Sequence, residues 1–138
     1  MTSFYYLVVG GLVSLLLGGM SLAGNVSSMA DLQKHVHQVA SRVTAATVAL
    51  VSDGGETGSG VIVTPQGLIL TAAHVVGGDE IMRVVFADGR VVKGRVLGAN
   101  FTRDAAMVQI MDGGNYPHVE LGESDGLHVG DFVVALGH

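Results

Sequence analysis

Between Thr47 and Ala73 the chain reads TVALVSDGGETGSGVIVTPQGLILTAA, a run of β-branched and apolar residues that is interrupted twice. The two interruptions are DGG at 53–55 and PQG at 65–67. Both have turn chemistry, because glycine tolerates a positive φ and proline presets the first corner of a turn. The pattern therefore predicts short strands joined by tight turns.

The same alternation continues toward the C-terminus. Residues 81–98 read IMRVVFADGRVVKGRVLG, and the Asp88-Gly89 pair between the two runs is typical of a type I′ hairpin, in which both central residues have positive φ. We expect further strands at about 105–111 and 131–136. Six or seven short strands, turns near every ten residues and little helix predict an all-β barrel or sandwich.

Composition narrows the classes of protein. A chain of 138 residues provides one small domain, and a hydrophobic content of 49% with only 14% charged residues excludes an intrinsically disordered chain. The net charge of −5 argues against a nucleic-acid partner, which would require clustered Lys and Arg. Because cysteine is absent, disulfide frameworks and thiol nucleophiles are excluded as well.

The first thirty residues have a different character. No charged side chain precedes Asp31, residues 4–17 read FYYLVVGGLVSLLL, and small-x-small cleavage patterns occur at 21–23 and 28–30. We interpret residues 1–30 as a signal peptide or membrane anchor, in which an apolar helix at 4–23 is long enough to span the hydrocarbon core. Either interpretation places the remainder outside the cytoplasm, in the periplasm or as a secreted protein.

A short amphipathic helix is expected directly after this leader. Apolar residues recur at helical spacing as Leu32, Val36, Val39 and Val43, which predicts a helix over about 30–41. His35 and His37 lie two apart on it and so point away from each other, which excludes chelation by the pair.

Two residues further along are candidates for chemistry. His74 follows the strand LILT between small residues, a position that leaves one edge of its ring open. Thirty residues later Asp104 precedes the apolar run AAMVQI, where a buried carboxylate would need a donor such as an imidazole N–H. By contrast, His118 and His128 lie in polar loop sequence without a second ligand at metal spacing, and His138 is the last residue.

A family resemblance gives this pair its meaning. GSGVIVTPQGLILTAAHVV at 58–76 and RDAAMVQI at 103–110 closely resemble the first half of trypsin-like serine proteases, and more narrowly the bacterial HtrA (Deg) branch of that chymotrypsin-fold family. The resemblance covers about 30–138. It implies that residues 31–138 form the N-terminal six-stranded barrel of the two-barrel fold and that the domain is incomplete at the C-terminus.

The same resemblance implies the roles of the two residues. His74 would act as general base and then general acid through Nε2, and Asp104 would accept the Nδ1–H and fix the tautomer. The reaction would be peptide-bond hydrolysis through a serine ester, with no metal and no organic cofactor. The partners implied are unfolded or misfolded proteins, and exposure of the face that packs on the second barrel leads us to expect homo-oligomers.

The nucleophile has no match in the chain. The family's serine lies in a G-[ND]-S-G-G-P segment, and neither Ser59, in Gly-Ser-Gly, nor Ser124, in Glu-Ser-Asp-Gly, has that context. We therefore expect the chain to be a partial reading frame that is inactive alone. Two alternatives remain open at this point: a non-catalytic pseudoprotease barrel that binds unfolded polypeptide or a protein partner, and an anchored structural β-domain in which His74 and Asp104 are relics.

Overall fold

The computed structural model describes residues 23–137, which belong to two compact units that meet between His35 and Val36. The helix α2 runs from Ala23 to Thr44, so the helix predicted at 30–41 exists but is longer at both ends. No proline interrupts this stretch, and Thr44 extends it by donating its hydroxyl to the Ala40 carbonyl oxygen at 2.7 Å. Arg42 in the last turn also favours the helix, because its charge opposes the negative end of the helix dipole.

Residues 1–22 lie outside the described part of the chain, and with them most of the expected leader. The division into a leader at 1–30 and a barrel domain at 31–138 therefore stays a prediction. Along residues 23–137, no helix combines the length and the apolar character that crossing a membrane requires.

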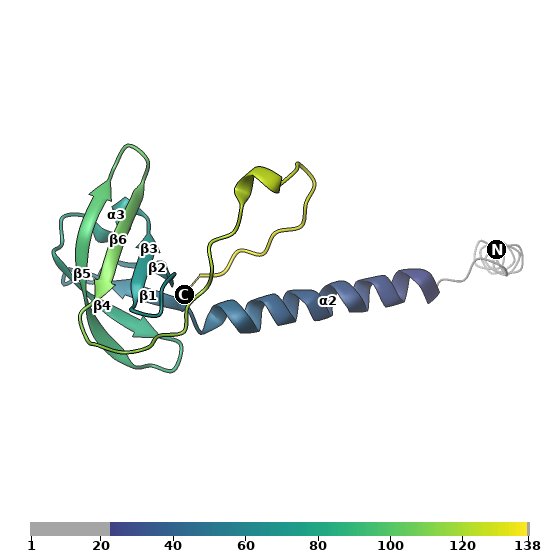
Figure 1. The fold of residues 1–138 in the computed structure, drawn as a ribbon, viewed down its shortest axis with the longest axis horizontal. Helices are drawn as coiled ribbons and strands as arrows, with labels where there is room; N and C mark the ends of the chain where they lie inside the picture. The colour runs from purple at the N-terminus through teal and green to yellow at the C-terminus, as the bar shows by residue number, and fades with distance from the viewer. Residues whose placement is uncertain (1–22, 138) are drawn as a thin grey trace, which may run out of the picture. The chain divides into compact units, whose positions relative to one another are not determined.

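The strands form a closed antiparallel barrel in the order β1-β2-β3-β6-β5-β4 (Figure 1). Their bounds are β1 Thr47–Val51, β2 Thr57–Ile62, β3 Leu68–Thr71, β4 Ile81–Phe86, β5 Val91–Asn100 and β6 Ala105–Ile110. The fold class predicted from the sequence, a six-stranded all-β barrel preceded by a helix, is thus confirmed for the described residues.

Alternation along each strand fills the interior of the barrel. In β6, for example, Ala106, Val108 and Ile110 are buried while the residues between them face outward. Together with the inward residues of the other strands they form one apolar core, whose largest fully buried side chains are Leu50, Ile62, Ile69, Met82, Val48, Val76, Val84 and Val108. Because every strand has two neighbours, the barrel leaves no unpaired edge.

Three of the tight turns use the same device. Gly55, Gly67 and Gly89 all have φ between 84° and 86°, and each donates its N–H to the carbonyl oxygen three residues earlier. The hairpin predicted at 88–89 is therefore present, but it is not the two-residue type I′ turn, because Gly89 has a positive φ and Asp88 does not. The side chain of Asp88 instead accepts the N–H of Arg90 at 2.9 Å and stabilises a longer loop.

The prediction of a strand at about 131–136 is wrong. Residues 131–137 have no regular secondary structure, and large apolar side chains there are exposed, Phe132 at 86% and Val133 at 77%. The alternation that suggested a strand is real, but the six strands already close on one another and offer no free edge to pair with.

Gly94 provides a test of how tightly the barrel is packed. A Cβ atom at this position in β5 would lie 2.7 Å from Val108 and 2.9 Å from Val84, both fully buried. We expect Gly94→Ala to reduce the free energy of unfolding by about 1–3 kcal/mol, the usual cost of overpacking a core. Gly98→Ala in the same strand is the control, because nothing lies within 4 Å of a Cβ atom there. Urea unfolding checks both variants, and equal midpoints would contradict this account.

Candidate active site

His74 lies on a single helical turn that follows β3. The helix α3, Ala73–Val76, is fixed to the barrel because Ala73 and Val76 are 0% and 1% exposed. Gly77 ends the turn with a φ of 52° and an N–H bonded to the carbonyl oxygen of Ala73 at 3.0 Å. The turn thus holds His74 at the surface, with its side chain 73% exposed.

A glycine in β2 allows this turn to sit close to the barrel. A Cβ atom at Gly58 would lie 2.4 Å from Cγ2 of Val75, closer than real contacts allow, so any side chain there would displace the residue beside His74. Gly60 has a similar role toward the core, since a Cβ atom there would lie 2.6 Å from Ile69. The Gly-Ser-Gly segment at 58–60 is therefore a packing surface beneath the histidine turn.

Asp104 ends the loop between β5 and β6. Its φ of 50° makes it the non-glycine residue with a left-handed backbone in the described range, a conformation that costs about 1–2 kcal/mol for an ordinary L-residue and less for Asp or Asn. Such strain persists where neighbouring contacts impose it. Here the contacts are those that its carboxylate makes with His74.

Both carboxylate oxygens of Asp104 bind His74. Oδ2 lies 2.8 Å from Nδ1 of the imidazole, and Oδ1 accepts the backbone N–H of His74 at 3.0 Å. A carboxylate can only accept, so Nδ1 must carry the proton and Nε2 is left as the basic nitrogen. Nε2 makes no hydrogen bond to any residue between 23 and 137.

The bond to the backbone also completes α3. Ala72, the residue before the helix, provides no side-chain cap, and the Asp104 carboxylate takes that function from another loop. The pKa of Asp104 is lowered, first by the backbone N–H of His74 and next by the imidazole N–H. The N–H of Ala73 lowers the pKa further, while partial loss of hydration opposes these effects.

The remaining candidates lie apart from this pair. His35 and His37 are exposed on α2, and His118 contacts the carbonyl oxygen of Tyr116 through Nδ1 at 3.1 Å. Nδ1 of His128 lies 3.9 Å from Oδ2 of Asp131. Ser124 is nearby in sequence, as the first residue of a short 3-10 helix, Ser124–Gly126. No group of three or more His, Asp or Glu suited to a metal ion occurs within the described stretch, and His138 is outside it.

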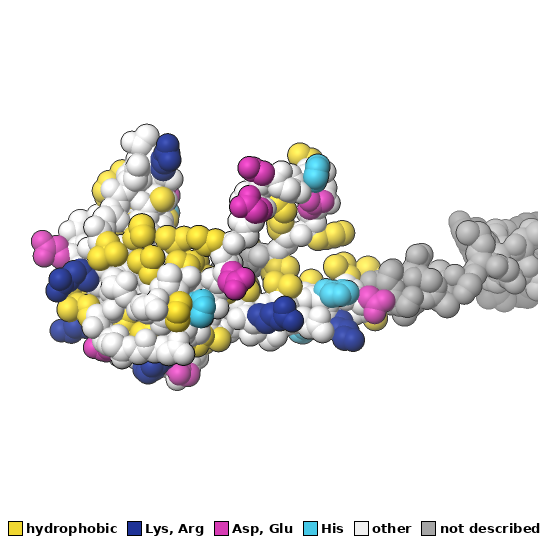
Figure 2. All heavy atoms as spheres, viewed as in Figure 1, with side chains coloured by type: hydrophobic (Ala, Val, Ile, Leu, Met, Phe, Trp, Pro, Cys, Tyr) yellow, Lys and Arg dark blue, Asp and Glu magenta, His cyan; other side chains and the backbone are white. Residues whose placement is uncertain are grey.

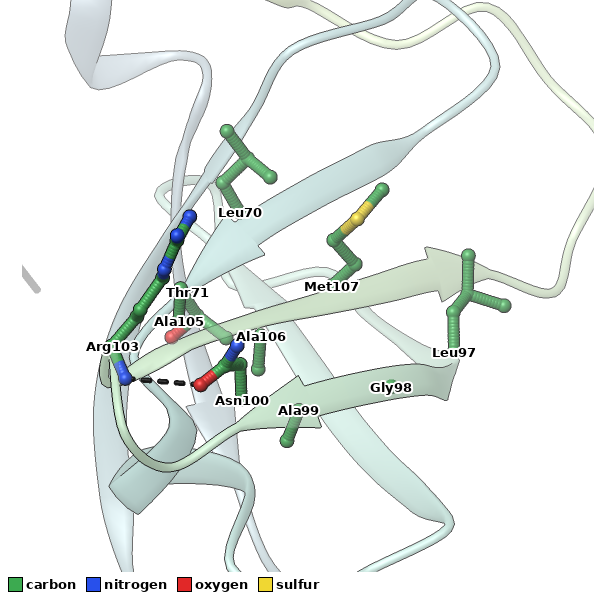
Figure 3. Close-up of a pocket in the computed structure, with 10 residues that line it drawn as sticks. All are labelled: Leu70, Thr71, Leu97, Gly98, Ala99, Asn100, Arg103, Ala105, Ala106 and Met107. Atoms are coloured by element: carbon green, nitrogen blue, oxygen red, sulfur yellow. Dashed lines mark hydrogen bonds between the residues drawn. The ribbon is translucent and has the colours of Figure 1, made fainter.

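A shallow groove runs over the outer face of β3, β6 and β5, beside the Asp104 loop (Figure 3). Its volume is about 480 Å³ and its lining is mainly apolar, with Leu70, Met107 and Leu97 projecting from the same side of the sheet. Arg103 is the charged residue of the lining. Sequence reasoning missed this groove, since its floor combines three strands through a bulge at Leu97.

Sequence reasoning also missed Asn100. Its side-chain Oδ1 accepts the backbone N–H of Arg103 at 3.0 Å, one residue before Asp104 (Figure 3). The available signal was an Asn at the first position of a turn, a placement that favours such bonds.

Comparison with known proteins identifies the class to which this arrangement belongs. Residues 58–138 match the family model of the trypsin-like peptidase domain. The serine endoprotease from Yersinia pestis has a similar structure, with a TM-score of 0.62 and 30% identity over 70% of this chain and 36% of that chain. The chain therefore belongs to the trypsin-like peptidase family of serine proteases.

Its relatives narrow the assignment to the HtrA/Deg branch. The periplasmic serine endoprotease DegP of Salmonella typhimurium is 38% identical over 82 residues, which cover 59% of this chain and 17% of DegP. The serine protease PepD of Mycobacterium tuberculosis is 37% identical over 114 residues, 74% of this chain and 25% of PepD. The chain thus spans a quarter or less of the length of these two relatives.

The two bonds of Asp104 predict how its carboxyl titrates. We expect a pKa below the ordinary value of 3.8 in the wild-type chain. His74→Ala should raise the pKa only part of the way back, because the backbone N–H that contributes most remains. Titration of the ¹³C carboxyl resonance by NMR measures both, and full return to 3.8 in His74→Ala would contradict the ranking of the two bonds.

The same bonds predict a dependence of stability on pH. Because the pKa is lower in the folded than in the unfolded chain, the stability that they contribute is complete above the unfolded value and is lost as the pH falls through the folded value. Urea unfolding at pH 5 and at pH 3 should therefore show a smaller loss of stability for Asp104→Asn than for wild type. Equal losses would mean that the carboxylate contributes nothing to folding.

Proposed function

We propose that His74 and Asp104 are the base and the orienting acid of a serine peptidase whose nucleophile is supplied by polypeptide outside these 138 residues. One observation carries the proposal: the 2.8 Å hydrogen bond between Nδ1 of His74 and Oδ2 of Asp104 engages Nδ1 and leaves Nε2 as the ring nitrogen available to accept a proton, on a side chain that is 73% exposed. An exposed base held in one tautomer is what removal of a proton from a hydroxyl group requires.

In this mechanism His74 first accepts the proton of the attacking serine hydroxyl at Nε2, as the serine oxygen bonds to the carbonyl carbon of the peptide. The resulting imidazolium is stabilised by the Asp104 anion, which stays ionised. Collapse of the tetrahedral intermediate breaks the C–N bond, and His74 gives its proton to the leaving amine. Water, activated by the same nitrogen, then hydrolyses the ester.

The serines within the chain are poor candidates for this attack. Ser59 belongs to β2, and a Cβ atom at Gly137 would lie 3.2 Å from its hydroxyl oxygen. Ser124 begins an exposed 3-10 helix between acidic residues. Neither lies in a G-[ND]-S-G-G segment, the context that the family's nucleophile turn and its oxyanion donors need.

We therefore expect the 138-residue chain to show no proteolysis by itself. Purified chain incubated with unfolded casein should leave the substrate intact, and a fluorophosphonate probe should leave the chain unlabelled, since triad members act as a unit. Labelling at Ser59 or Ser124 would refute this expectation. Ser59→Ala and Ser124→Ala are the matched controls that would locate such a label.

The proposed function itself is tested by the coding sequence that follows His138. A serine in a G-[ND]-S-G-G context downstream supports it, and the extended protein should then lose most of its casein hydrolysis in His74→Ala and Asp104→Asn. The loss in Asp104→Asn follows because an amide no longer fixes the tautomer with Nε2 free. A stop codon directly after His138 would overturn the proposal that this chain is part of a serine peptidase.

The class of substrate and the compartment follow from the same family. Unfolded or misfolded protein is the proposed substrate, as the resemblance to the HtrA branch implies. Two observations support a location outside the cytoplasm: the uncharged, apolar residues 4–23, and the periplasmic location in the name of the relative DegP. Retention of these residues as an anchor remains part of the proposal, since residues 4–22 lie outside the described range.

Binding of polypeptide without hydrolysis is a second candidate. The observation that favours it is the apolar groove of about 480 Å³ over β3, β6 and β5, where Leu97 is 55% exposed. Retention of reduced, unfolded casein on immobilised chain that carries the His74→Ala substitution would support binding independent of chemistry. Failure of casein to bind would leave hydrolysis by the completed enzyme as the remaining function.

Exposed apolar side chains also predict self-association. Figure 2 shows hydrophobic side chains gathered over one face of the barrel, and Leu97, Phe101 and Met107 are 55%, 65% and 41% exposed. We expect a chain lacking residues 1–22 to exceed monomer mass in light scattering, because contiguous apolar surface favours association. Leu97→Lys in the groove should reduce the mass, whereas Val91→Lys, also in β5 but outside the groove, should not. A monomer in all three samples would exclude this surface as a contact.

A further inference from the structure

We infer that Asn100 is a positioning residue, whose side-chain oxygen holds the loop 100–104 so that the Asp104 carboxylate faces His74. The inference rests on the proposed function only for its catalytic consequence. Its structural basis is the bond from the Arg103 N–H to Oδ1 of Asn100, 3.0 Å long, which spans the loop from its first residue to the one before Asp104 (Figure 3).

Apart from this bond and the two bonds that Asp104 makes with His74, the loop has little to hold it. Asn100 and Ala105 form the last pair of the β5–β6 ladder, so residues 101–104 cross between the strands without strand bonds. All four of these residues are exposed, Phe101 at 65%, and no backbone–backbone hydrogen bond within 101–104 occurs in the described structure. The bond from the Arg103 N–H to the Asn100 side chain therefore holds the loop in place, as a backbone hydrogen bond does in an ordinary turn.

The bond between Asn100 and Arg103 favours the backbone conformation of Asp104 that its contact with His74 requires. Asp104 has a φ of 50°, and in that left-handed conformation its two oxygens reach both the N–H and the Nδ1 of His74. With the Arg103 N–H tied to Asn100, the chain enters Asp104 from a fixed direction. Without it, the exposed loop gains other conformations in which the carboxylate no longer faces the imidazole.

Three variants of the full chain separate this role from a general contribution to stability. Asn100→Ala removes the acceptor, Asn100→Ser keeps a neutral oxygen that can accept the same N–H, and Thr102→Ala shortens an exposed side chain of the same loop that makes no described bond. The ¹³C titration of the Asp104 carboxyl and the ¹⁵N shifts of the His74 ring report on the pair directly. Neither readout depends on hydrolysis, so failure here is distinct from failure of the proposed peptidase function.

We expect Asn100→Ala to raise the pKa of Asp104 toward 3.8 and to reduce the fraction of His74 with its neutral-ring proton on Nδ1. Asn100→Ser should restore most of both properties, and Thr102→Ala should match wild type. Should Asn100→Ala not fold, Asn100→Gln takes its place, because its extra methylene displaces the oxygen. If the folded Asn100→Ala or Asn100→Gln variant has the same Asp104 pKa and the same His74 tautomer as wild type, the inference is overturned, even if the variant is less stable.

Discussion

One carboxylate joins two loops that are thirty residues apart in sequence. Asp104 accepts the backbone N–H of His74 and its imidazole N–H, so a single side chain caps the short helix α3 and fixes the tautomer of the ring that the helix carries. Position and protonation of the histidine therefore depend on the same two bonds. The proposed chemistry needs both, because a base must be in the right place and must have its free nitrogen unprotonated.

The barrel provides the rigid frame on which these bonds rest. Val75 packs over Gly58 on one side of His74, while Ala73 and Val76 insert into the core on the other. On the aspartate side the frame is less complete, because residues 101–104 are exposed and one side-chain bond from Asn100 spans them. The site thus combines a histidine held by packing with an aspartate held by polar contacts.

Much of this could be predicted from the sequence, for identifiable reasons. Alternating β-branched residues fix the strands, and the TAAH and RDAA segments identify the two residues that meet. Other features could not be predicted. The pattern at 131–136 alternates like a strand, but pairing depends on a free edge that the closed barrel lacks. Asp88-Gly89 resembles a two-residue turn, yet the loop is longer, and an Asn before a turn is too common to single out Asn100.

The order of strands in the barrel has a kinetic consequence. Among the strands that the structure describes, β6 comes last in sequence, and it pairs with both β3 and β5, so its pairing closes the ring. Asp104 directly precedes β6, and His74 lies in α3, three residues after the end of β3. Because contacts between segments distant in sequence form at an entropic cost, the contact of Asp104 with His74 and the pairing of β6 with β3 require closure of the same loop of chain. A nascent chain that has not yet reached residue 104 on the ribosome would carry the histidine but would have no orienting acid for it.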